Sequence, residues 1–240
     1  EYLVKAIAND DQIQQIRTQG GADFGFAFGT KARFRVSAFK ERGSMALVLR
    51  QIPNELLTIE QIGLDQGLVD KLLNTPRGMI LVTGPTGSGK STTLASMIDI
   101  INREQDHCHL ITIEDPIEMV DPKLNQMQVH HDIKLDFAAG VKALLRQDPD
   151  IIMVGEMRDQ ETVDIGLRAA LTGHLVLSTL HTNDAISSAM RLIDMGAPAY
   201  LVASSLRAII AQRLVRRICN ECKTPYHPDK QEQSWLTYLG

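Results

Sequence analysis

The segment Gly84–Ser91, which reads GPTGSGKS, constrains the fold of this chain more than any other part of it. It follows a short apolar run at 79–83 and precedes an amphipathic stretch at 90–103. A glycine-rich turn between a strand and a helix presents backbone N–H groups to phosphate, while its lysine neutralises charge and its serine binds Mg²⁺. We therefore expect a phosphate-binding loop whose contacts come from Gly84, Pro85, Thr86, Gly87, Ser88, Gly89, Lys90, Ser91 and Thr92.

The sequence around this loop predicts an α/β fold with a parallel sheet. Short, branched apolar runs bounded by Gly, Pro or Asp lie at 79–83, 109–114, 151–155 and 175–179. Stretches of helical periodicity lie between or after them, at 90–103, 137–147, 159–172, 185–195 and 198–217. Strands that are apolar on both faces and alternate with helices are typical of a parallel sheet covered on both sides.

The first part of the chain has a different pattern. Apolar residues at helical spacing predict a helix at 1–18, and alternating residues predict three strands at 24–28, 34–38 and 45–52. A helix and an antiparallel meander are small for an independent unit. We expect a partial N-terminal domain at 1–53, a linker at 54–60 and the nucleotide-binding domain at 61–240.

The composition argues against several classes of protein. The chain has 240 residues, of which 44% are hydrophobic, enough for a packed core. A formal net charge of −4 argues against a general nucleic-acid binder, which usually carries a basic excess. No apolar run approaches the roughly 18 residues of a membrane span. We therefore expect a cytoplasmic protein without direct membrane insertion or a nucleic-acid partner.

Carboxylates and a histidine follow the other predicted strands. Glu156 ends the apolar segment 150–156, where a carboxylate can act on Mg²⁺ or its water. Glu114, Asp115 and Glu118 follow the second strand, and one of them can polarise an attacking water unless the turn is only a solvated acidic loop. His181 follows the last strand, where it is either a γ-phosphate contact or a structural histidine.

Two further groups of residues each allow two interpretations. Arg33, Arg35 and Arg50 lie on predicted strands and are either solvated side chains or a clamp that reaches a nucleotide. Cys219 and Cys222 form half of a four-cysteine zinc site. Either a second pair lies beyond Gly240 or these are two free thiols.

Four segments together resemble the Walker A, Asp box, Walker B and His box of the secretion-superfamily ATPases of type II secretion and type IV pili. They are Gly84–Ser91, TIEDPIE at 112–118, DPDIIMVGEMRD at 148–159 and TLHT at 179–182. The resemblance implies a hexameric ring of chains, each with a RecA-like domain after a smaller PAS-like domain. ATP would bind between these two domains.

The resemblance also implies roles for individual residues. Lys90 and Ser91 would bind phosphate and Mg²⁺, and Glu156 would be the Walker B carboxylate that acts on Mg²⁺. Glu118 would be the general base, and His181 would lie near the γ-phosphate. The arginines that would reach the nucleotide are Arg35, Arg50 and Arg146. Cys219 and Cys222 would begin a zinc module whose second cysteine pair this chain lacks.

As a function, the resemblance implies a motor that couples ATP hydrolysis to assembly or retraction of pilus or pseudopilus filaments, through a platform protein of the inner membrane. Residues 1–63 look like retraction ATPases, whereas 191–225 look like assembly and secretion ATPases. The direction of the motor therefore stays open. The alternatives are a RecA-like DNA translocase, against which the acidic balance argues, and a slowly hydrolysing, nucleotide-gated interaction module.

Overall fold

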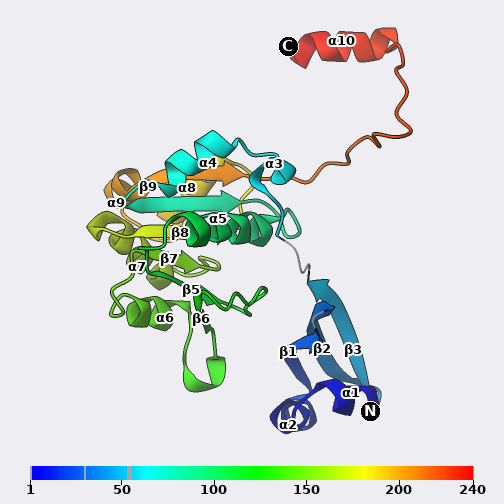
Figure 1. Cartoon of the computed structure of the whole chain (residues 1–240), viewed down its shortest axis with the longest axis vertical. Helices are drawn as coiled ribbons and strands as arrows, with labels where there is room; N and C mark the ends of the chain where they lie inside the picture. The colour runs from blue at the N-terminus through cyan, green and yellow to red at the C-terminus, as the bar shows by residue number, and fades with distance from the viewer. Residues whose placement is uncertain (1, 30, 53–55, 240) are drawn as a thin grey trace.

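The computed structural model describes residues 2–29, 31–52 and 56–239 of the chain. It contains a three-stranded sheet of order β1-β2-β3 and a six-stranded sheet of order β6-β5-β7-β8-β4-β9 (Figure 1). The small sheet is antiparallel and the large one is parallel. The predicted α/β class is therefore confirmed. The predicted domain boundary at 53 and 54 lies outside the described residues.

The N-terminal helix predicted at 1–18 is wrong as a single element. The structure has two helices there, α1 (Tyr2–Ile7) and α2 (Asp10–Gln19). Asn9 is extended between them, its side chain accepts a hydrogen bond from the Gln12 backbone, and the Gln12 side chain accepts one from the Asn9 backbone. This capping box starts a new helix and ends the previous one. The left-handed Gly20, with φ of 87°, ends α2.

The predicted antiparallel meander is confirmed. It consists of β1 (Gly21–Phe28), β2 (Ala32–Glu41) and β3 (Ser44–Ile52). Phe24 and Val36 are buried on one face of the sheet in a small core with Val4 of α1 and Ile16 of α2. This face of the meander is therefore covered by the two helices.

The predicted strands and helices of the second part are confirmed up to residue 195, with small shifts at their ends. The strands are β4 (Gly78–Thr83), β5 (Leu110–Glu114), β7 (Ile151–Val154) and β8 (Leu175–Leu180). The helices are α5 (Lys90–Glu104), α6 (Phe137–Leu144), α7 (Gln160–Thr172) and α8 (Ala185–Asp194). The structure also has five elements that the patterns did not predict: α3 (Ile59–Ile62), α4 (Gln66–Leu73), β6 (Asn125–Gln128), a 3₁₀ turn (His131–Ile133) and α10 (Lys230–Leu239). Helix α3 begins within the predicted linker at 54–60.

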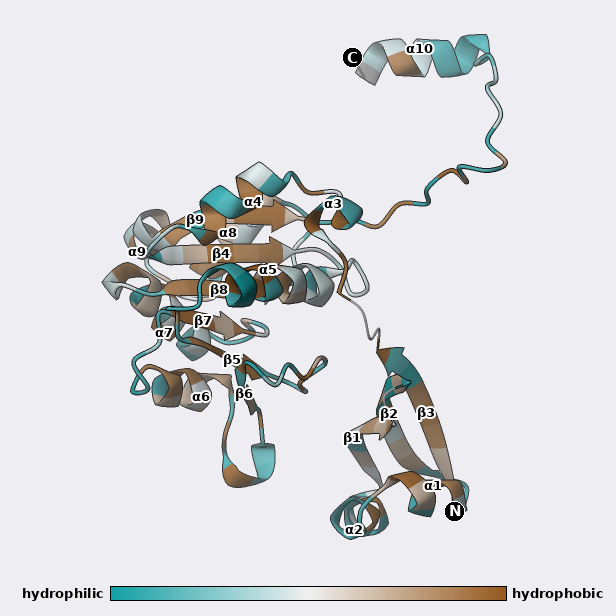
Figure 2. Ribbon diagram, in the orientation of Figure 1, coloured by the Kyte–Doolittle hydropathy of each residue, from teal (hydrophilic) through white to brown (hydrophobic). Residues whose placement is uncertain are grey.

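Apolar layers cover both faces of the large sheet. Met79 and Leu81 of β4 pack into a core with residues of α6, α7 and α9 (Ala199–Ser205). Ile80 and Val82 of the same strand pack into a second core with residues of α3, α4 and α5. Figure 2 shows the hydrophobic strands running between these helices. The sheet is covered on both sides, as its continuous apolar strands predict.

The helix predicted at 198–217 is wrong. Helix α9 ends at Ser205, and Leu206–Ala211 form β9, which pairs in parallel with β4 at the edge of the sheet. Ile209 packs against the first core and Ile210 against the second. Pairing with the open side of β4 satisfies backbone groups that a continued helix would leave exposed on that strand.

Candidate active site

The carboxyl ends of four parallel strands bring the predicted site residues to one edge of the large sheet. Gly84 follows β4, Glu114 ends β5, Glu156 follows β7 and His181 follows β8. Since β5, β7, β8 and β4 are neighbours in the sheet, the loops that carry these residues are neighbours too. Ligands of open parallel sheets bind at this edge.

The loop between β4 and α5 has a conformation that requires glycine. Gly84, Gly87 and Gly89 have φ of 153°, 78° and 90°. A Cβ atom on Gly84 would lie 2.4 Å from Ser88 Oγ and 2.5 Å from the carbonyl oxygen of Gln212. The Lys90 Nζ atom turns back onto the loop and donates to the carbonyl oxygens of Gly84 at 3.1 Å and Pro85 at 3.2 Å.

The loop also contains a buried hydroxyl without a partner. Ser88 is 3% exposed, and its Oγ makes no hydrogen bond with any described residue. Buried polar groups are nearly always paired, so this orphaned group needs a partner of its own. Together with the glycine cradle at the start of α5, it fits a bound phosphate. Ser91 is exposed in the first turn of α5, and Thr92 follows it half-buried.

A chain of polar contacts joins the loops after β4, β8 and β7. Lys90 Nζ lies 3.4 Å from His181 Nδ1, and His181 Nε2 lies 3.2 Å from Glu156 Oε1. Both contacts are hydrogen bonds when Nε2 carries the proton, because Nδ1 then accepts from the ammonium and Nε2–H donates to the carboxylate. Arg158 Nη2 extends the chain, 2.8 Å from Glu156 Oε2. The sequence patterns did not single out Arg158.

Burial shifts the pKa of two groups at this edge. Loss of solvent lowers the pKa of Lys90, and the nearby Glu156 partly offsets this change. Burial raises the pKa of Glu114, although its Oε1 accepts hydrogen bonds from Thr112 Oγ1 at 2.7 Å and Gln126 Nε2 at 3.1 Å. Glu118 is exposed in the loop after β5. Among the described residues, no hydrogen bond or ion pair joins Glu118 to the chain formed by Lys90, His181 and Glu156.

The three arginines to which the resemblance assigns a role lie elsewhere. Arg35 of β2 and Arg50 of β3 are directly opposite each other in the antiparallel register, so their side chains share one face of the small sheet. Opposed like charges are unfavourable unless an anion lies between them. Arg146 is exposed between the end of α6 and the start of β7. It therefore lies at the opposite edge of the large sheet from Lys90.

Neither the two cysteines nor the pocket beside β9 forms a second site among the described residues. Cys219 and Cys222 are exposed free thiols. Within residues 2–29, 31–52 and 56–239, no group of three or more His, Cys, Asp or Glu could hold a metal, so these residues do not complete a four-ligand zinc site.

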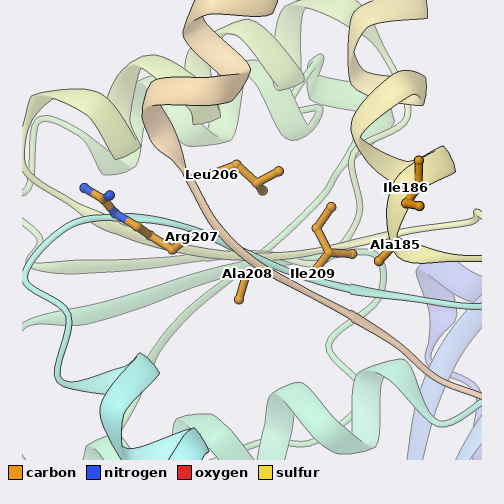
Figure 3. Close-up of a pocket in the computed structure, with 6 residues that line it drawn as sticks. All are labelled: Ala185, Ile186, Leu206, Arg207, Ala208 and Ile209. Atoms are coloured by element: carbon orange, nitrogen blue, oxygen red, sulfur yellow. The ribbon is translucent and has the colours of Figure 1, made fainter.

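A pocket against β9 and α8 contains no carboxylate or histidine (Figure 3). No helix of the described part is long and apolar enough to cross a membrane.

Comparison with known proteins shows the family to which the chain belongs. A model of the family described as type II/IV secretion system protein matches residues 4–238. The chain belongs to this family. The resemblance seen in the four motifs is therefore confirmed.

Individual relatives include pilus and secretion proteins. The type IV pilus assembly ATPase TfpB of Acinetobacter baylyi is 50% identical over 214 residues, covering 87% of this chain and 36% of that protein. The type II secretion system protein E of Pseudomonas aeruginosa is 42% identical over 238 residues, covering 97% of this chain and 47% of that protein. The chain thus spans about a third to a half of the length of these curated relatives.

A solved structure shares the fold. The crystal structure of the pilus retraction motor PilT with bound ADP superposes with a TM-score of 0.84 at 44% identity, covering 91% of this chain and 66% of that chain. Assembly and retraction proteins thus both occur among the relatives.

Proposed function

We propose that this chain binds and hydrolyses ATP at the carboxyl edge of its parallel sheet. The observation that supports this most strongly is the contact chain from Lys90 through His181 to Glu156, which joins three loops around the glycine cradle. Phosphoryl transfer to water depends mainly on positioning and charge neutralisation. This edge of the sheet supplies groups for both purposes. The Lys90 ammonium can neutralise charge, and the His181 imidazole and Glu156 carboxylate can position reacting groups.

Each residue of the edge has a proposed role. Lys90 and the loop N–H groups bind the β- and γ-phosphates. When nucleotide binds, the Lys90 ammonium would donate to phosphate oxygens instead of to the carbonyl oxygens of Gly84 and Pro85. Ser91 and Glu156 would hold Mg²⁺, which supplies further charge neutralisation when bound. Glu118 accepts a proton from the attacking water as general base. His181 would orient Glu156 and contact the γ-phosphate.

Several chains would complete the site. We propose a homohexamer in which Arg35 and Arg50 provide positive charge to the nucleotide from the small sheet. Their opposed placement supports this role, because an anion would relieve the repulsion between them. Arg146 lies at the opposite edge from Lys90, so it would act on a nucleotide held by a neighbouring copy. In each case a guanidinium would contact phosphate oxygens.

At the level of the cell, we propose a cytoplasmic motor that drives assembly or retraction of a type IV pilus or type II secretion filament. It would associate with the inner membrane through a platform protein. The relatives of the chain support this proposal, since they include a pilus assembly ATPase, a retraction motor and a secretion protein. Cys219 and Cys222 are given no role in it, because they supply two of the four ligands of a structural zinc site.

Substitution of Lys90 tests the ATPase proposal. K90A should lower ATP turnover at least about 100-fold, since it removes the charge that faces the phosphates. K71A, which removes an exposed lysine of α4, is the matched control and should turn over like the wild type. Turnover of K90A at the wild-type rate would overturn the assignment of the site. Turnover that requires DNA would favour a translocase.

Deletion of the gene tests the direction of the motor. Loss of surface pili or of secretion is the result expected for an assembly or secretion motor. An excess of surface pili is the result expected for a retraction motor. Unchanged pili and secretion would contradict the proposed cellular function without affecting the assignment of the ATPase site.

A further inference from the structure

The residue that follows β9 bonds to both ends of the phosphate-binding loop. The backbone N–H of Gln212 donates to the carbonyl oxygen of Thr83, the last residue before the loop, at 2.8 Å. Its side-chain Oε1 accepts a hydrogen bond from Thr93 Oγ1, in the first turn of α5, at 2.7 Å. Thr93 is fully buried and Gln212 is half-buried, so this bond is partly shielded from water. Gln212 thus connects the strand before the loop to the helix after it.

Gln212 also packs closely against two glycines of the loop. Its carbonyl oxygen lies 2.5 Å from where a Cβ atom on Gly84 would be, and its Nε2 lies 3.0 Å from where one on Gly89 would be. These distances leave no room for a side chain at Gly84 and very little at Gly89. The two glycines therefore let the backbone carbonyl and the side chain of Gln212 approach the loop closely.

The next residue fastens Gln212 to the loop that carries His181. The Arg213 Nη2 atom donates to the carbonyl oxygen of Asn183 and, at 3.2 Å, to its Oδ1. Thr83 Oγ1 donates to the carbonyl oxygen of Thr182 at 3.0 Å, which joins the same two loops from the other side. Gln212 is therefore held between the phosphate-binding loop and the loop after β8.

We infer that Gln212 is a positioning residue for the nucleotide, acting through Thr93 on the loop Gly84–Ser91. This inference rests on the proposed function, since it assumes that the loop binds a nucleotide. Gln212 does not itself contact phosphate in this role. It keeps the loop N–H groups and Lys90 in the arrangement that binds the phosphates, so its loss should weaken affinity for nucleotide without abolishing the site.

The bond between Gln212 and Thr93 can be tested with a fluorescent ADP on the full 240-residue chain. Q212L and T93V should each weaken binding about fivefold, the effect of losing one hydrogen bond. The double variant should bind no more weakly than the weaker single variant, since both substitutions remove one bond. T93S keeps the hydroxyl and should bind several-fold more tightly than T93V.

Controls separate this inference from loss of folding and from failure of the proposed function. Q147L replaces an exposed glutamine before β7 and should bind like the wild type. Thermal unfolding of each variant identifies any that do not fold. If Q212L does not fold, the comparison of T93S with T93V still tests the inference. Wild-type affinity in Q212L and T93V, or additive losses in the double variant, would overturn the inference. Failure of the wild type to bind ADP would instead overturn the proposed function.

Discussion

His181 Nε2 lies 3.2 Å from Glu156 Oε1, while Nδ1 of the same ring lies 3.4 Å from Lys90 Nζ. The imidazole therefore connects a cation of the loop after β4 to a carboxylate of the loop after β7. Glu156 is the better shielded partner, with a side chain that is 18% exposed against 43% for His181. The ring thus joins a shielded carboxylate to the ammonium expected to bind phosphate.

Because the two side chains form one unit, their substitutions should not be independent. H181A and E156Q should each lower ATP turnover about tenfold or more, in line with the loss of a positioned polar group. The double variant should be no slower than the slower single variant. Steady-state turnover of the four proteins measures this coupling. Losses that multiply would show that His181 acts separately from Glu156.

Substitution of Glu118 and of Glu114 shows which of the two is the general base, because only loss of the base should slow ATP turnover without weakening nucleotide binding. E118Q should lower turnover about 100-fold or more while it still binds fluorescent ADP, because a general base acts after binding. E104Q, at the exposed end of α5, is the control and should be unaffected. If E118Q turns over normally and E114Q does not, Glu114 is the base.

Burial of Glu114 predicts a dependence of stability on pH. Its pKa in the folded chain is raised above the ordinary value of 4.5, so just above that pH the folded state binds more protons than the unfolded state. This group's contribution to the free energy of unfolding therefore falls as pH rises through that window. Glutamine does not titrate, so the melting temperature of E114Q relative to the wild type should increase from about pH 4.5 upward. A difference that is constant with pH would contradict this explanation.

A helical glycine tests how tightly the large core is packed. A Cβ atom on Gly140 of α6 would lie 1.8 Å from Ile113 Cδ1, and Ile113 is fully buried. G140A should destabilise the chain by about 1–3 kcal/mol in denaturant unfolding. G67A is the matched control, because α4 has room there, and it should be stabilising by up to about 1 kcal/mol. Equal effects of the two substitutions would show that Ile113 moves aside freely.

Local patterns in the sequence determined most of the fold. The glycine-rich loop, the doubly apolar strands such as Met79–Thr83 and the alternating strands of the meander were all predicted correctly. The break at Asn9 was missed by the prediction of one helix at 1–18, although Asn followed three residues later by Gln is a helix-start signal. These features depend on hydrogen bonds and side-chain directions within a few residues, so the amino-acid order alone specifies them.

Contacts between distant segments were decided only by the tertiary structure. Leu206–Ala211 have apolar residues that suit a helix or a strand, and the open edge of β4 made them a strand. The same pairing brings Gln212 onto the phosphate-binding loop, and parallel register brings His181 to Glu156. Arg146 lies at the far edge because the chain direction of β7 separates it from Lys90. No local propensity encodes these placements, because each depends on which strand pairs with which.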